Sequence, residues 1–312
     1  PRIGISHVIT DDATFTFNYG VYYQTPIYEN VYRNTNRQED PEELFEQADG
    51  LVGNASMSSQ RTKSYEFAFN FKVGNHWGFQ VGAWVKDMDQ LVTSRFYRSG
   101  IYDYQVASNG DFGRANGLDF TIQNRGLLVN TVVQYTLMSA KANGDQVQAS
   151  SVYVDAPAQE YTMPFDRTHD LTVSLYGPIP FINAVWGLTG FYQSGFPYTP
   201  YIEDGNKWKE DPYNLYGKRS EAYKKINISL SKAVAYKDFS VSLGLNVLNL
   251  YSTDNHLAVW PITGDAYDPG TYYTDEIDLP TNEGSVSGSY YDMPWRVSTP
   301  REINFFIQMD FK

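Results

Sequence analysis

The sequence predicts an all-β fold, namely a transmembrane antiparallel up-and-down β-barrel of which about eleven strands are present. Three observations predict it: a high aromatic content, an alternation of apolar and polar side chains, and connections that alternate between short and long. Aromatic residues make up 16% of the 312 residues. Membrane barrels need them as lipid-facing bulk and in the girdles at both interfaces, so this content favours a barrel over a soluble domain.

Apolar side chains alternate with polar or small ones over most of the chain. In the run 62–73, for example, Phe67 and Phe69 alternate with Glu66 and Ala68. Because successive side chains of a strand point to opposite faces, each such run predicts a strand with one apolar and one polar face. Eleven strands are predicted, most of them long enough to cross a bilayer when tilted, at 2–9, 12–23, 62–73, 76–88, 112–123, 127–139, 167–176, 182–193, 221–234, 238–251 and 301–311.

The connections between these strands alternate in length. Short ones are predicted at 10–11, 74–75, 124–126, 177–180 and 235–237. Long ones are predicted at 24–61, 89–111, 140–166, 194–220 and 252–300. Tight turns at one end and long loops at the other are typical of an up-and-down barrel with periplasmic turns and external loops. A Greek-key sandwich has no reason to sort its loops in this way.

The direction of the strands predicts that the barrel is incomplete. The first and eleventh strands run the same way, so the chain would begin at the outer face and end at the inner one. Closed single-chain bacterial barrels normally have an even number of strands and both ends in the periplasm. An open sheet would also leave a lipid-exposed edge, which a bilayer does not tolerate. We therefore expect residues 1–312 to be the C-terminal portion of a larger barrel, with further strands upstream.

Composition argues against several classes of function. The net charge of -12 argues against nucleic acid as a partner, because phosphate binding needs a basic surface. The absence of cysteine excludes disulfides and thiolate metal sites. The four histidines are scattered, and neither a nucleophile elbow nor a phosphate-binding glycine loop occurs. The sequence therefore predicts that the chain is not an enzyme.

Five short motifs resemble those of a known family, in the family's order. They are Pro1–Ser6 (PR-x-G), Asn109–Asp119 (N-x-G…G-x-E, with Asp119 in place of the usual Glu), Phe165–His169 (FD-x-T-H), Asn246–Tyr251 (N-x-x-N-L-Y), and Pro300 with Arg301 before the closing strand. That strand is amphipathic with an aromatic residue near its end, which resembles the signal read by the barrel-assembly machinery. Together these residues resemble a TonB-dependent outer-membrane receptor of the kind found in Bacteroidetes-type bacteria.

The resemblance implies a 22-stranded barrel in the bacterial outer membrane, of which eleven strands would be the C-terminal half. It also implies a plug domain and a TonB-binding segment upstream. The implied function is import of a nutrient, such as an oligosaccharide, a peptide or a metal chelate, through the plugged barrel. The implied partners are the lipid bilayer, the TonB complex through the plug segment, and the barrel-assembly machinery. A surface lipoprotein is a further partner that the resemblance allows.

Two other functions stay open from the residues themselves: a passive porin or channel, and a surface adhesin or assembly component anchored by the barrel. The polar side chains expected to face inward would contact a plug in a receptor and line water in a porin. They are Glu66, Asn70, Lys72, Gln80, Asp119, Gln123, Asn130, Gln134, Asp170 and Asn227. Trp84 interrupts the apolar–polar alternation of its run.

Ligand capture is predicted in the last two long loops, which are rich in aromatic and acidic residues. Aromatic faces can stack on sugar rings or peptide side chains. The candidate ligand-binding residues are Tyr198, Tyr201, Trp208, Trp260, Tyr272, Tyr273, Tyr290 and Trp295. The alternative interpretation is that these side chains only pack and solvate the loops.

An acidic cluster in the last loop suggests a structural calcium ion. Asp265, Asp268, Asp275 and Glu276 supply the hard oxygen ligands that calcium prefers, although the spacing is not that of an EF-hand. No other cofactor is expected. A second acidic run, at 39–49, is interpreted as the solvated face of a short helix.

Overall fold

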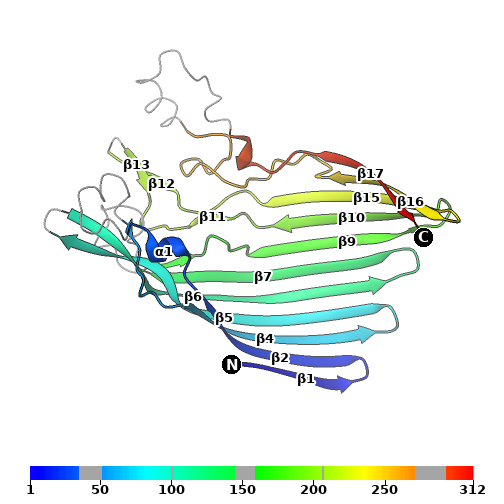
Figure 1. Ribbon diagram of the computed structural model, residues 1–312, viewed down its shortest axis with the longest axis horizontal. Coiled ribbons are helices and arrows are strands. Elements are labelled where there is room, and N and C mark those ends of the chain that lie inside the picture. Colours follow the sequence, from blue (N-terminus) through cyan, green and yellow to red (C-terminus); the bar gives the residue numbers. More distant parts are fainter. Residues whose placement is uncertain (35–50, 100–101, 145–158, 206, 271–292, 312) are drawn as a thin grey trace, which may run out of the picture.

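The computed structural model describes residues 1–34, 51–99, 102–144, 159–205, 207–270 and 293–311. They form a 13-stranded sheet whose main path holds eleven antiparallel strands in sequence order (Figure 1). These are β1 (Arg2–Thr10), β2 (Ala13–Gln24), β4 (Gln60–Val73), β5 (Trp77–Ser99), β6 (Tyr102–Arg125), β7 (Asn130–Gly144), β9 (His169–Ile179), β10 (Ala184–Gln193), β15 (Tyr223–Ala235), β16 (Phe239–Leu248) and β17 (Glu302–Phe311). The predicted all-β fold and its eleven strands are confirmed.

The two ends of the sheet differ as the sequence predicted. Figure 1 shows the tight turns gathered at one end and the long connections at the other, with β1 and β17 as the edge strands. The N-terminus lies towards the long-loop end and the C-terminus at the turn end. We call these the loop end and the turn end of the sheet.

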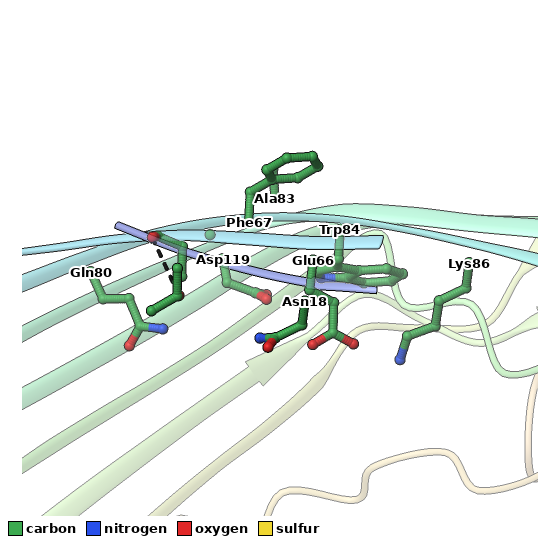
Figure 2. A pocket seen from close by; sticks show the side chains of 11 residues that line it. Asn18, Glu66, Phe67, Gln80, Ala83, Trp84, Lys86 and Asp119 are labelled. Carbon is green, nitrogen blue, oxygen red and sulfur yellow. Dashed lines mark hydrogen bonds between the residues drawn. The ribbon is translucent and has the colours of Figure 1, made fainter. Parts of the chain in front are cut away.

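The strand register assigns each side chain of the sheet to one of two faces. Phe67 of β4 pairs with Ala83 of β5, and the adjacent Glu66 pairs with Trp84. Figure 2 shows Phe67 and Ala83 on one side of the strands and Glu66 and Trp84 on the other, which faces the remainder of the curved sheet. We call the first side the outer face and the second the inner face.

The outer face is apolar along the middle of the strands. Aromatic rings meet across neighbouring strands, with centroids 4.9 Å apart for Phe17 and Phe67 and 5.0 Å apart for Phe71 and Phe79. Such pairs contribute about 1 kcal/mol each beyond the area that they bury. The face nevertheless leaves large side chains open, including Phe67, which is 45% exposed. A continuous apolar surface of this kind requires an apolar environment.

Ion pairs mark where the apolar band stops, towards the loop end. Arg61 holds Asp89 through two guanidinium nitrogens at 2.7–3.0 Å, and the Arg114 Nε atom lies 2.6 Å from an oxygen of Asp87. The charged row therefore closes the outer apolar band on one side.

The prediction of a long loop at 89–111 is wrong, because β5 extends to Ser99, β6 begins at Tyr102, and the two strands remain paired there. The pairing shifts register between Met88 and Leu91, where Gln90 adopts a positive φ of 58°. The Asn109 side chain donates to the Gln90 carbonyl at 2.8 Å and so holds this bulge. The hairpin lies beyond the apolar band, where the alternation that reveals a strand in the sequence is lost.

Short elements fill the connections at the loop end. They are α1 (Tyr28–Tyr32), β3 (Leu51–Val52), β8 (Gln159–Thr162), β11 (Pro197–Tyr198), β12 (Tyr201–Asp204), β13 (Lys207–Glu210), β14 (Lys218–Arg219) and η4 (Pro294–Arg296). Within the described ranges, no helix is long and apolar enough to cross a membrane. The acidic run at 39–49 lies outside the described residues.

Candidate functional site

The inner face carries a hollow of about 370 Å³ over β2, β4, β5 and β6. Three of the residues predicted to face inward, Glu66, Gln80 and Asp119, line it. Figure 2 shows their side chains on the same side of the strands as the Trp84 indole. The side chains that give the hollow its chemistry are those of Thr16, Asn18, Glu66, Gln80, Trp84, Lys86 and Asp119.

Trp84 is the one large aromatic side chain on the inner side of this hollow. Its indole lies along the inner face of the sheet because the residue that pairs with it on β6 is Gly117, which has no side chain. A Cβ atom on Gly117 would come within 2.6 Å of the Trp84 ring. Trp84 also packs against the small buried cluster of Ala115, Ala140, Ala142 and Met163. The indole is thereby held in place with its plane along the sheet.

Charged and polar groups surround this indole. The Lys86 Nζ atom lies 5.2 Å from the ring centroid, within the range of a cation–π contact. One oxygen of Glu66 accepts a hydrogen bond from Ser64 at 2.9 Å. One oxygen of Asp119 accepts a hydrogen bond from Thr136 at 2.7 Å. Both carboxylates are therefore oriented by neighbouring hydroxyl groups and keep a second oxygen for other partners.

A second polar centre lies at the loop end around Asp166, a residue that is 1% exposed. Its carboxylate accepts hydrogen bonds from the Ala140 N–H group at 2.7 Å and from the Thr168 hydroxyl at 3.2 Å. It also forms an ion pair with Arg219. Burial, together with the charge of Arg219, lowers the pKa of the neighbouring Arg167. We call Ala140, Asp166, Thr168 and Arg219 the Asp166 cluster, which joins β7, the segment that leads into β9, and β14.

A third centre holds together the two ends of the last long loop. Asn249, 1% exposed and with a φ of 51°, donates to the carbonyls of Thr253 at 3.0 Å and Thr299 at 2.9 Å. Its own N–H group donates to the Asn227 side chain at 3.0 Å. We call Asn227, Asn249, Thr253 and Thr299 the Asn249 cluster. It fixes the point where the chain leaves β16 and the point where it returns to β17.

The last two long loops meet at the loop end, as ligand capture by both would require. The Tyr201 N–H group donates to the Pro261 carbonyl at 3.1 Å. The Tyr198 hydroxyl lies against Gly264, where a Cβ atom would come within 2.1 Å of it. Burial raises the pKa of Tyr198. Two of the predicted ligand-binding residues thus lie between the loops.

Two further candidates flank one guanidinium group. The Arg296 guanidinium lies 3.7 Å from the ring centroid of Trp260 and 5.0 Å from that of Trp295. Trp260 is buried under it, whereas Trp295 is 62% exposed. Trp295 is therefore the more accessible of the two to a ligand. Trp208 lies on β13, paired with Glu203, and Tyr272, Tyr273 and Tyr290 lie outside the described residues.

The acidic residues proposed for calcium are only partly described. Asp265 accepts hydrogen bonds from the N–H groups of Tyr267 at 2.6 Å and Asp268 at 3.0 Å. Burial acts to raise the pKa of Asp265, but these two hydrogen bonds outweigh it and the pKa is lowered. Asp275 and Glu276 lie outside the described residues. In the part of the chain that is described, no group of three or more acidic or histidine side chains could hold a metal ion.

Sequence reasoning did not identify the Trp84 hollow. The available signal was the interruption of the alternation at Trp84, together with a glycine on the strand that pairs with it. The motif residues Asn109, Asp166 and Asn249 have hydrogen-bonding roles at bulges and strand ends. In this structure they hold the loop end of the sheet together.

Several solved structures share this fold. The ferric-catecholate import receptor Fiu of Escherichia coli K12 aligns with a TM-score of 0.57 and 14% identity over 99% of this chain and 34% of its own. The outer-membrane transporter YddB of Escherichia coli aligns with a TM-score of 0.59 and 8% identity over 96% of this chain and 38% of its own. The ferripyoverdine receptor of Pseudomonas aeruginosa aligns with a TM-score of 0.59 and 9% identity over 99% of this chain and 32% of its own. The chain thus spans about a third of the length of these structures.

Comparison with protein families gives the assignment that such distant likeness cannot give. A search of curated proteins finds no match. The family model described as TonB dependent receptor-like, beta-barrel matches residues 1–250, which is most of the chain. Members of that family are transporters of the bacterial outer membrane and not enzymes. The chain therefore belongs to the TonB-dependent receptor-like β-barrel family, and its eleven-stranded sheet corresponds to part of a 22-stranded barrel.

Proposed function

We propose that residues 1–312 are the C-terminal half of the barrel of a TonB-dependent transporter that imports a nutrient across the outer membrane. The plug domain and the TonB-binding segment would then belong to the same polypeptide, outside this chain. The observation that carries the proposal is the two-faced wall: an apolar outer face suited to lipid and a polar inner face with a hollow suited to the lumen.

The nutrient would be an oligosaccharide, a peptide or a metal chelate. Tyr201, Trp208 and Trp295 in the last two long loops offer aromatic surface for its capture. The structurally similar receptors import ferric catecholates or bind ferripyoverdine, which supports a metal chelate as one of these classes. The lipid bilayer, the TonB complex, the barrel-assembly machinery and a surface lipoprotein are the partners that this function would require or allow.

A passive channel is the second candidate, because the polar inner face would also line water. Uptake of labelled ferric chelates, oligosaccharides and peptides by cells that express the full-length protein, with and without TonB, separates the two. Active import predicts uptake that is lost when TonB is deleted. Uptake that persists without TonB would show a passive channel, and surface attachment without uptake would show an adhesin.

A further inference from the structure

We propose that two neighbouring turns at the turn end of the sheet, 126–129 and 180–183, insert apolar side chains into the adjacent membrane leaflet and anchor this part of the barrel rim in lipid (Figure 1). The side chains concerned are those of Leu127, Leu128, Phe181 and Ile182, which we call the rim patch. They lie beyond the ends of the strands, where the tight turns of a barrel are expected in water. The inference needs a barrel in the membrane but not transport, so it would stand equally for a passive channel.

The rim patch is apolar and open to its surroundings. Leu127 is 92% exposed and Phe181 is 87% exposed, and the two other members are exposed as well. Neither turn contains a charged side chain. The two turns are neighbours, because β6, β7, β9 and β10 follow one another in the sheet. Large apolar side chains that gather at a surface in this way mark a contact with another apolar body.

The turns on either side of the rim patch have the opposite character. The turn between β1 and β2 contains Asp11 and Asp12, and the turn between β15 and β16 contains Lys237 and Asp238. The turn 74–76, between β4 and β5, consists of glycine, asparagine and histidine. Apolar turns are therefore confined to the middle of the described sheet, and the rim patch is a local feature of the rim.

The course of the first turn indicates that its partner is lipid. The strand pairing that starts at Ala83, through Leu118 and Leu137, assigns Gly177 to the outer face of β9. A Cβ atom on Gly177 would overlap the carbonyl oxygen of Leu128. The turn 126–129 therefore passes over the outer face, on the side away from the lumen where a plug would lie. The rim patch thus continues the apolar band of the outer face, which in a membrane barrel contacts lipid.

The backbone limits how deep the turns can lie. The hydrocarbon core does not tolerate unsatisfied backbone groups, but the interfacial region lets apolar side chains reach the acyl chains while the backbone stays hydrated. In the second turn, the N–H groups of Ile182 and Asn183 donate to the carbonyls of Ile179 and Pro180, both at 3.3 Å. Fewer of its backbone groups then need water, which suits a shallow insertion.

Spin labels that report depth in the membrane test the anchor. The full-length protein, in a background without other cysteines, is reconstituted into vesicles of phosphatidylethanolamine and phosphatidylglycerol. Labels at Leu127→Cys and Phe181→Cys should collide with oxygen, which concentrates in lipid, more than with a nickel chelate, which stays in water. The ratio of the two collision rates should be about fivefold higher than for Asp11→Cys and Lys237→Cys, the matched controls in the flanking turns.

Two outcomes of the depth measurement would overturn the inference. Equal ratios at the four positions would show that the rim patch lies in water. Poor access to both reagents at Leu127→Cys and Phe181→Cys would show that protein, a plug or a second copy of the chain, covers the patch.

A double variant, Leu127→Ser with Phe181→Ser, gives an independent test of the same contact. The equilibrium constant for unfolding from these vesicles should rise about tenfold, because apolar contact with lipid is lost. Leu257→Ser changes an exposed leucine at the loop end and is the control, which should leave the constant unchanged. An unchanged constant in the double variant would also overturn the inference. TonB-dependent uptake would still stand in each case, so the two proposals fail separately.

Discussion

The long paired strands of the main sheet, which we call the wall, and the Asp166 and Asn249 clusters at its loop end are stabilised in different ways. The wall rests on backbone pairing and on side chains that stay partly exposed on both faces. The most fully buried large side chains, Asp166 and Asn249, are polar and lie where strands pass into loops. The comparison teaches that the most fully buried large side chains of the described residues lie at the loop end of the sheet. In the wall, the surrounding lipid must take the place of a core.

The largest loss of stability should follow removal of the Asp166 carboxylate. Asp166→Ala leaves Arg219 without its ion pair and the Ala140 N–H group without its acceptor. We expect a loss of about 3 kcal/mol, the low end for a broken buried pair, because Arg219 is about one-third exposed. Urea unfolding of the full-length protein in lipid vesicles would measure it. Asp87→Ala, which breaks the exposed pair with Arg114, is the control and should change little.

A charge placed in the wall should distinguish the two faces. Phe67→Lys puts an ammonium group on the outer face, and we expect a loss of about 2 kcal/mol if that face meets lipid. Ala68→Lys, one residue on, points to the inner face, where there is room in the hollow, and should be nearly neutral. The same unfolding assay measures both. Equal losses would contradict the assignment of the outer face to lipid.

Substitution of Asn249 should destabilise the protein slightly less than substitution of Asp166, because no ion pair is broken. Asn249→Ala removes the hydrogen bonds to Thr253 and Thr299 and places alanine at a φ of 51°, so we expect a loss of about 2 kcal/mol. Asn249→Gly relieves the backbone strain and should cost less. If both variants were as stable as the wild type, this cluster would not hold the loop ends together.

The same contrast explains what the sequence could predict. In the wall, each strand must present alternate faces to lipid and lumen, so the alternation around Phe67 gave both the strand and its face. At the loop end no such constraint acts, and the strands of the hairpin 89–111 were expected as a loop. Asp166 and Asn249 are residue types common in turns, and their burial depends on partners distant in sequence, Arg219 and Thr299.

The smallest loss of stability should come from the position that pairs with Trp84 on the inner face, Gly117. Gly117→Ala places a methyl group within 2.6 Å of the Trp84 ring and 3.0 Å of the Leu137 carbonyl, so the indole must lift from the wall. We expect a loss of about 1 kcal/mol from this overpacking, with a change in the tryptophan emission. Gly78→Ala is the matched control, since nothing lies within 4 Å of its added Cβ atom. If Gly117→Ala left both stability and tryptophan emission unchanged, the close contact between Gly117 and the Trp84 ring would not contribute to the stability of the sheet.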